Sequence, residues 1–172
     1  MKSRTHILHL SDRVRLIVFF LSALLLALTP LFVHMQWFTG PLVNALLFAT
    51  VVIIGPAEAI FIGLIPSTVA LMSGLLPLPL APMIPFIMIG NAIMILSFFY
   101  IYKKQKILAV LLASFLKFVF LYIVSQTILT KILDQNILSK LAIMMSWSQF
   151  FTACIGGFIA LLFIKFLHVK SE

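Results

Sequence analysis

The chain has 172 residues, of which 63% are hydrophobic and only 9% are charged. Its mean hydropathy of +1.24 excludes an ordinary soluble domain and indicates a protein that lies in a lipid bilayer. The net charge of +8 does not indicate a nucleic-acid partner, because the basic residues lie at the ends of apolar runs instead of in one surface stripe.

The apolar residues form long runs with short breaks between them. Crossing about 30 Å of hydrocarbon takes roughly 20 apolar residues as a helix, and continuous runs are not typical of the alternating strands of a membrane barrel. We therefore expect an all-α integral membrane protein, a six-transmembrane-helix bundle that forms a single membrane domain over residues 1–172. The expected spans are 16–33, 42–56, 59–76, 83–102, 107–128 and 147–167.

Lysine and arginine residues are retained on the cytoplasmic side of membrane proteins. With six spans, three basic clusters fall on one side, and the other side carries Lys131 and Lys140 with Asp134 between them. We therefore expect a multi-pass protein with both termini in the cytoplasm. The three clusters are Lys2, Arg4, Arg13 and Arg15; Lys103, Lys104 and Lys106; and Lys165 and Lys170.

Four prolines, Pro77, Pro79, Pro82 and Pro85, follow the third expected span in the stretch GLLPLPLAPMIPFIMIGN. Proline fixes φ and removes a backbone donor, so the run predicts a stiff hairpin at the outer ends of the third and fourth spans. The hairpin is either a simple rigid turn or one rigid wall of an outward-facing cavity. Asn91 favours the cavity, because its amide lies about 10 Å below the outer surface and needs partners there.

Lys117 lies near the middle of the fifth expected span. A lysine at that depth costs about 2.5–3.5 kcal/mol on insertion scales, so it should face the bundle interior. It either contacts a ligand or pairs internally with Glu58 or with free carbonyl groups. Helical spacing places Ser114, Leu121 and Ser125 on the same face, and Tyr122 borders it.

The sixth expected span presents a face of small and polar residues that allows a neighbouring backbone to come close. That face consists of Gln149, Thr152, Ala153, Gly156 and Ala160. Trp147 stands at the outer end of this span, and Trp37 precedes the second span. Each tryptophan is either a membrane anchor or a platform on which a ligand stacks.

Polar and aromatic residues of the later spans share one level in the outer half of the bundle. They predict a pocket that opens away from the cytoplasm and binds a small polar or anionic, partly aromatic molecule. Within it, Lys117 would meet an anionic or carbonyl group, and Asn91 and Gln149 would orient the molecule. The candidate substrate-binding residues are Asn91, Lys117, Tyr122, Ser125, Gln126, Trp147, Gln149 and Trp37.

No residues of the sequence form a recognised catalytic motif, such as HExxH, Gly-x-Ser-x-Gly, a Walker A loop or paired intramembrane aspartates. We therefore expect neither an enzyme nor a cofactor or metal site. Glu58 should be a carboxylate at the start of a helix near the cytoplasmic turn, where the helix dipole favours it, or a contact for a cytoplasmic-side partner.

One motif and three stretches resemble the substrate-binding S components of energy-coupling factor (ECF) vitamin transporters. The motif is Ala23-Leu-Leu-Leu-Ala27, which is similar to the Ala-x-x-x-Ala motif by which S components dock on their coupling subunit; small residues one turn apart let helices approach closely. The stretches are LVNALLFATVVIIGPAEAIFIGLIPSTVALMSGLLPLPLAPMIPFIMIGNAIMIL, KFVFLY and GGFIALL, which are similar to a bacterial subgroup of unassigned substrate.

The resemblance covers nearly the whole chain and implies a substrate-capture subunit for a vitamin or similar micronutrient in the bacterial plasma membrane. Its implied partners are a coupling transmembrane subunit, docked at Ala23 and Ala27, and two ATPase subunits that supply ATP hydrolysis. Two other functions remain open. One is a membrane assembly or scaffold subunit, and the other is a stand-alone secondary carrier, for which Glu58 is the available carboxylate.

Overall fold

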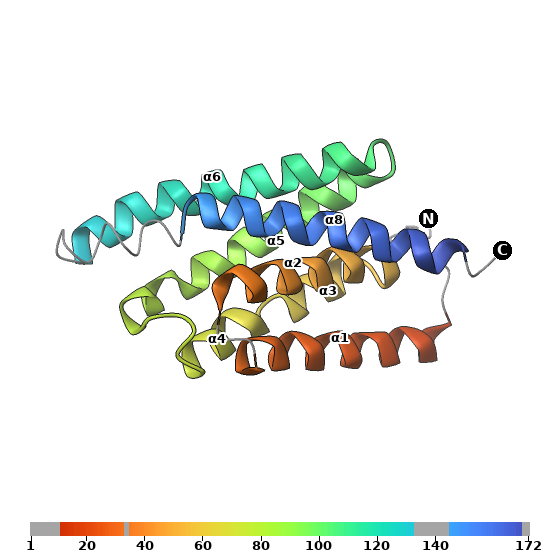
Figure 1. Ribbon diagram of the computed structural model, residues 1–172, viewed down its shortest axis with the longest axis horizontal. Helices are drawn as coiled ribbons and strands as arrows, with labels where there is room; N and C mark the ends of the chain where they lie inside the picture. Colours follow the sequence, from red (N-terminus) through yellow and green to blue (C-terminus); the bar gives the residue numbers. More distant parts are fainter. Residues whose placement is uncertain (1–10, 33–34, 133–144, 170–172) are drawn as a thin grey trace.

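The structure, a computed structural model, describes residues 11–32, 35–132 and 145–169. Within these ranges every regular element is a helix, as expected, and none is a strand (Figure 1). The helices are α1 (Asp12–Phe32), α2 (Gln36–Ile53), α3 (Pro56–Ile62), α4 (Ile65–Met72), the 3-10 helix η1 (Leu78–Met83), α5 (Ile84–Tyr102), α6 (Lys106–Ile132) and α8 (Trp147–Val169).

The helices run up and down the long axis of one bundle. Figure 1 shows the start of α1, the α2–α3 turn, the α5–α6 turn and the end of α8 together at one end. We call this the basic end, because it carries Arg13, Arg15, Lys103, Lys104, Lys106 and Lys165. Lys131 lies at the opposite end, as expected, whereas Lys2, Arg4, Asp134, Lys140 and Lys170 lie outside the described residues.

In the described part of the chain, five helical segments are long and apolar enough to cross a membrane. Their outward surfaces are apolar too: Phe20 is 66% exposed and Leu162 is 70% exposed. Large apolar side chains on so much of the surface fit contact with lipid and a multi-pass membrane protein. The five segments are Asp12–Phe32, Gln36–Ile53, Leu78–Tyr102, Lys106–Ile128 and Trp147–Phe166.

The expected third span, residues 59–76, is wrong as one continuous helix. The chain forms α3 and α4 with a break at Gly63 and Leu64. Pro66, in the first turn of α4, has no N–H to donate to the carbonyl four residues earlier, and the Leu64 N–H instead bonds the Phe61 carbonyl at 3.3 Å in a tighter turn. The two short helices run back along the bundle as a broken segment, in which α3 packs against α2 and α5 and α4 packs mainly against α1.

The second expected span begins six residues too late, because α2 starts at Gln36 and not at residue 42. Pro41 lies inside the helix, close enough to its start that few backbone hydrogen bonds are lost. The additional turn matters for the site, because it turns Gln36 and Thr39 toward the bundle interior.

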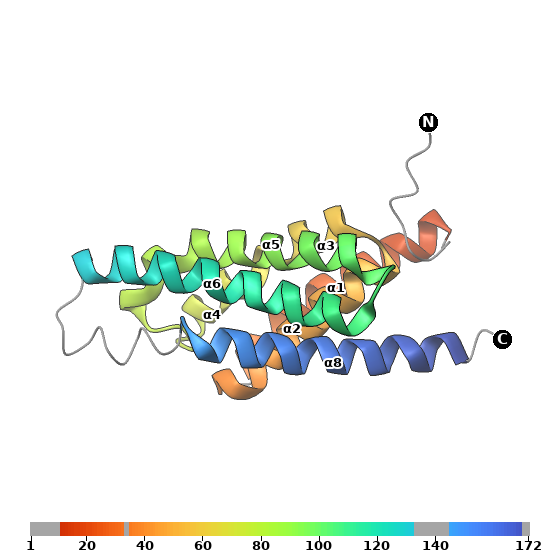
Figure 2. The same ribbon diagram turned by 90° about the horizontal axis from the view of Figure 1, so that it is seen from above.

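Among the residues that the structure describes, two clusters of buried side chains hold the bundle together. The larger cluster includes Leu47, Phe48 and Phe98 and extends toward the basic end. The smaller one lies at the opposite end and contains Leu76, Leu80, Met83, Leu121 and Met145. Figure 2 shows α5 and α6 side by side with α8 along them, and the main partner of α8 is α2.

The close approach predicted for the sixth span occurs between α8 and α2. Thr152, Ala153 and Gly156 are buried. A Cβ added at Gly156 would lie 2.5 Å from the Pro41 carbonyl oxygen, and one added at Gly40 would lie 2.9 Å from the Thr152 Cβ. Two helix backbones in such contact leave no room for a larger side chain, so glycine is required at position 156.

The proline run forms a compact turn at the end of the bundle opposite the basic end. Gly74 has φ +76, a left-handed conformation that favours glycine and ends α4. Pro77 then leads into η1, and Pro85 lies in the first turn of α5, where a missing N–H costs little. The predicted rigid turn is therefore present, and the residues just before the prolines, Leu75 and Leu76, line a cavity.

Candidate functional site

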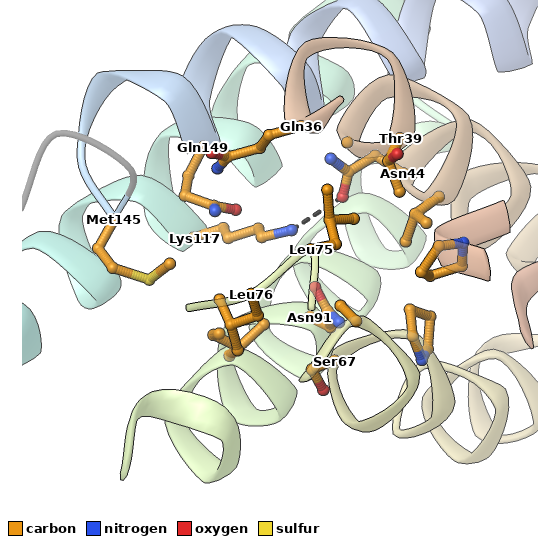
Figure 3. A pocket seen from close by; sticks show the side chains of 16 residues that line it. Gln36, Thr39, Asn44, Ser67, Leu75, Leu76, Asn91, Lys117, Met145 and Gln149 are labelled. Carbon is orange, nitrogen blue, oxygen red and sulfur yellow. Dashed lines mark hydrogen bonds between the residues drawn. The ribbon is translucent and has the colours of Figure 1, made fainter. Parts of the chain in front are cut away.

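A cavity of about 110 Å³ lies among α2, α4, α5, α6 and α8, toward the end of the bundle opposite the basic end. Its apolar wall includes Leu75 and Leu76 from the turn after α4 and Met145 just before α8. Its polar lining brings together side chains from five helices (Figure 3). These polar residues are Gln36, Thr39, Asn44, Ser67, Asn91, Lys117 and Gln149.

Lys117 is the central charged group of the cavity. It is 3% exposed, and its Nζ donates a hydrogen bond to Oδ1 of Asn44 at 2.8 Å. Figure 3 shows the side chain reaching across the cavity from α6 toward α2, between Gln149 on one side and Asn91 and Ser67 on the other. An ammonium group has three N–H donors, so the single bond to Asn44 leaves donors to face the cavity.

Asn91 connects the cavity to the helix break. Its Nδ2 donates to the Gly63 carbonyl at 3.1 Å, which satisfies a carbonyl at the end of α3. The amide is 3% exposed, yet within the described part of the chain its Oδ1 has no hydrogen-bond partner. The Oγ of Ser67, in α4, is also buried without a partner there. Buried polar atoms are normally satisfied, and Figure 3 shows the unpartnered oxygen of Asn91 directed toward Lys117, which makes this a candidate place for a bound molecule.

The helices position these groups for identifiable reasons. The close contact between α2 and α8 fixes the position of Asn44. A Cβ added at Gly156 would lie only 2.8 Å from the Asn44 Cβ, so the two helices touch at this residue. On α6, Ser114, Leu121 and Ser125 are buried along with Lys117, which confirms the predicted interior face. Tyr122 is 44% exposed, which confirms that it borders that face.

Three of the eight predicted binding residues, Asn91, Lys117 and Gln149, line this one cavity. They come from α5, α6 and α8, so their common level in the bundle was correctly inferred from depth alone. The hypothesis that Lys117 pairs with Glu58 is wrong. Its partner is Asn44, and Glu58 pairs instead with Arg15 near the start of α1.

Two of the other predicted binding residues belong to an aromatic cluster outside the cavity lining. Trp147 stacks on Phe118 with ring centroids 4.9 Å apart, and Phe118 also contacts Tyr122 at 5.9 Å. Trp147 is 59% exposed on the outside of the bundle. This position is typical of an interfacial anchor and places neither Trp147 nor Tyr122 against Lys117.

The remaining three predicted residues also lie outside the cavity lining. Ser125 is buried and donates to the Tyr122 carbonyl of its own helix at 2.9 Å. Gln126 is exposed, and Trp37 is 56% exposed near the start of α2. Ser125 faces the interior as Lys117 does but lies further along α6, outside the cavity lining, whereas the exposed side chains of Gln126 and Trp37 face outward.

Glu58 lies in the first turn of α3, as predicted. Its Oε1 accepts a hydrogen bond from Nη2 of Arg15 at 2.5 Å, and the same nitrogen donates to the Ile54 carbonyl at 3.1 Å. Arg15 therefore fastens the start of α1 to the α2–α3 turn. This ion pair accounts for both charges without a ligand.

The two small residues of the first span differ in their surroundings. Ala23 is half-buried and packs against the larger core cluster, and Ala27 is half-buried as well. The neighbouring leucines Leu24 and Leu25 are 54% and 49% exposed. The alanines therefore lie at the edge between the bundle and the outer surface of α1.

Asn44, Thr39, Gln36 and Ser67 are site residues that the sequence analysis did not identify. Asn44 could have been identified from the sequence, because an amide inside the apolar run LVNALLF needs a hydrogen-bond partner for the same reason as Asn91 does. Ser67 carried less signal, because serine is common next to proline in turns.

Comparisons of the chain with protein-family models, with curated proteins and with solved structures gave no match. Among the described residues, no group of three or more histidine, cysteine, aspartate or glutamate side chains is placed to hold a metal ion. A cation and an amide oxygen can hold a molecule that carries both an acceptor and a donor.

Proposed function

We propose that the protein is the substrate-capture subunit of an ECF-type importer for a vitamin or similar micronutrient. The observation that carries the proposal is the buried Lys117 in a cavity away from the basic end, beside the unsatisfied Oδ1 of Asn91. A lysine inside a membrane bundle is expensive, and such residues usually mark a path or a binding site. The ATP hydrolysis that drives import comes from two partner ATPases joined by a coupling transmembrane subunit.

The polar groups define the chemistry of the substrate. The free donors of Lys117 select a carboxylate or a carbonyl oxygen, and Oδ1 of Asn91 selects an N–H or O–H group next to it. A cavity of about 110 Å³ is smaller than the ~300 Å³ at which sites for drug-sized ligands begin. It holds the polar end of such a molecule, and the rest of a vitamin-sized substrate displaces the wall formed by Leu75, Leu76 and Met145.

The broken segment of α3 and α4 fits this role. In membrane proteins, non-helical backbone is tolerated where it lines a cavity or is buried in protein, and discontinuous helices often border substrate sites. Gly63, at the break, is bonded by Asn91, and Ser67 follows the break by one turn. A substrate that bonds Asn91 would therefore contact a group that also holds the break together.

A membrane scaffold is the second candidate, and a specific observation favours it. Lys117 bonds Asn44 across α6 and α2, and Asn91 bonds Gly63 across α5 and α3. Bonds of this kind hold helices together without any ligand. The two candidates differ in what Lys117→Met should change, which is bound substrate for the importer and assembly for the scaffold.

The first experiment isolates the tagged protein from its native membrane in mild detergent and identifies co-purifying proteins by mass spectrometry. The proposal expects a coupling subunit and two ATPases, lost in Ala27→Trp but retained in Ile123→Trp. Ile123 is 57% exposed on α6, so its variant controls for adding a large exposed side chain. Recovery of no ATPase with the wild-type protein rejects the importer, and a different stable complex favours the scaffold.

A second experiment tests the cavity. Small molecules released from the purified protein by denaturation are compared between wild type and Lys117→Met by mass spectrometry. The importer predicts a released carboxylate or carbonyl compound that is depleted at least tenfold in the variant. An equal yield from a folded variant would remove Lys117 from substrate recognition.

A further inference from the structure

A second cavity lies at the basic end of the bundle, on the outside of the helices. It is a groove of about 1130 Å³ between the α5–α6 turn, the first turns of α6 and the last turns of α8. This groove is separate from the cavity around Lys117, and the two share no lining residue.

The walls of the groove are apolar side chains that point outward. Ile107 is 61% exposed, Leu162 is 70% exposed, and Leu108 and Phe158 are each 41% exposed. In a membrane bundle these side chains face hydrocarbon, so the groove suits an acyl chain lying along it.

Three lysines surround the end of the groove. Lys104 comes from the α5–α6 turn, Lys106 is the first residue of α6, and Lys165 comes from the last turns of α8. The Nζ of Lys106 lies 5.7 Å from the ring centroid of Tyr102, a cation–π distance that holds this ammonium group beside the groove.

No acidic side chain among the described residues neutralises these lysines. The carboxylates in the described ranges are Asp12 and Glu58, and both line a different cavity together with Arg15. Within these ranges none of the three lysines forms an ion pair. The groove therefore combines an apolar floor with an unneutralised cluster of positive charge.

We propose that this groove binds an anionic phospholipid from the leaflet at the basic end. Its phosphate contacts Lys104, Lys106 and Lys165, and one acyl chain lies against Leu108, Leu111 and Phe158. Basic pockets between membrane helices bind anionic headgroups in this way. The site does not depend on the proposed importer function, because it is formed by other residues at the other end of the bundle.

The test titrates the detergent-purified protein with phosphatidylglycerol and, separately, with phosphatidylcholine of the same chains, and counts bound lipids by native mass spectrometry. At roughly fivefold per lysine, three lysines give a preference for phosphatidylglycerol on the order of 100-fold. The triple variant Lys104→Gln, Lys106→Gln, Lys165→Gln should reduce this preference to within about threefold of unity, and the corresponding triple arginine variant should retain it.

Lys103 provides the matched control. It lies in the same turn and is exposed, but it does not line the groove, so Lys103→Gln should leave the preference unchanged. Leu162→Trp, which fills the groove, should weaken binding of both lipids.

Four outcomes would overturn the proposal. One is equal binding of the two lipids by wild type, and another is a loss in Lys103→Gln as large as in the triple variant. The third is displacement of phosphatidylglycerol by millimolar glycerol phosphate, which would mean that the lysines bind a free phosphate without the chain. A protein subunit found in the groove in place of lipid would also contradict it.

Discussion

Gly156 lies where α8 meets α2, and replacing it by alanine tests how closely the two helix backbones approach. The new Cβ would lie 2.5 Å from the Pro41 carbonyl oxygen and 2.8 Å from both the Ala45 nitrogen and the Asn44 Cβ. Ordinary contacts between such atoms are about 3.5 Å, so α2 and α8 must separate by about 1 Å. Two of the three contacted atoms are backbone, so no side-chain rotation relieves the clash.

The loss of stability expected for Gly156→Ala can be estimated by comparison with Gly90, a second glycine inside a helix. A Cβ at Gly90 would meet only the Leu121 side chain, at 3.3 to 3.5 Å, and leucine can move by that much. Both substitutions gain the same helix propensity, about 1 kcal/mol, so this gain cancels in the difference. Gly156→Ala should therefore be less stable than Gly90→Ala by about 1–3 kcal/mol, the usual cost of overpacking.

The assay is reversible unfolding in mixed micelles by increasing SDS, followed by far-UV circular dichroism. The free energies of unfolding of the wild type, Gly156→Ala and Gly90→Ala are compared under the same conditions. Equal stability of the two variants would refute the close α2–α8 contact, and with it the structural reason for the position of Asn44.

Three further predictions use the same assay. Asn91→Leu should lower the free energy of unfolding by about 1–3 kcal/mol, because the buried Gly63 carbonyl at the break between α3 and α4 loses its donor. An unchanged free energy of unfolding would mean that water satisfies this carbonyl. Asn44→Leu should lower the free energy of unfolding by about 2 kcal/mol, because it removes the hydrogen-bond acceptor of Lys117. Adding Lys117→Met in the same protein should restore most of that free energy, because no buried charge is then left without a partner. A double variant as unstable as the single one would contradict this pairing. Arg15→Ala should lower the free energy of unfolding more than Glu58→Ala does, by up to about 1 kcal/mol, because the arginine also donates to the Ile54 carbonyl at the end of α2. A larger loss in Glu58→Ala would argue against the bond to Ile54.

The sequence by itself predicted the class of the protein and the faces of individual helices. Composition and continuous apolar runs indicated a helical membrane bundle, and the structure has helices long enough for one. Periodicity predicted that Lys117 and Ser125 turn inward on α6. Small residues predicted the close approach at Gly156. These inferences succeed because they depend on the geometry of one helix and on the cost of exposing a polar group to lipid.

The tertiary structure decided which side chains meet. Lys117 and Asn44 are 73 residues apart, and their contact depends on how α6 and α2 are rotated about their own axes. In the same way, the rotation of α8 about its axis places Trp147 outside the cavity, although its depth suggested otherwise. Depth and face give the position of a residue on its own helix, but the partner is chosen by packing against other helices.

The break between α3 and α4 also depends on tertiary structure and could not be predicted from the sequence alone. Pro66 and Gly63 were visible in the sequence, but proline also occurs at the start of unbroken helices and glycine inside them. The break is stable because Asn91, on another helix, donates to the freed Gly63 carbonyl. A backbone group that loses its bond inside a membrane must find another donor, and only the folded bundle determines whether one is within reach.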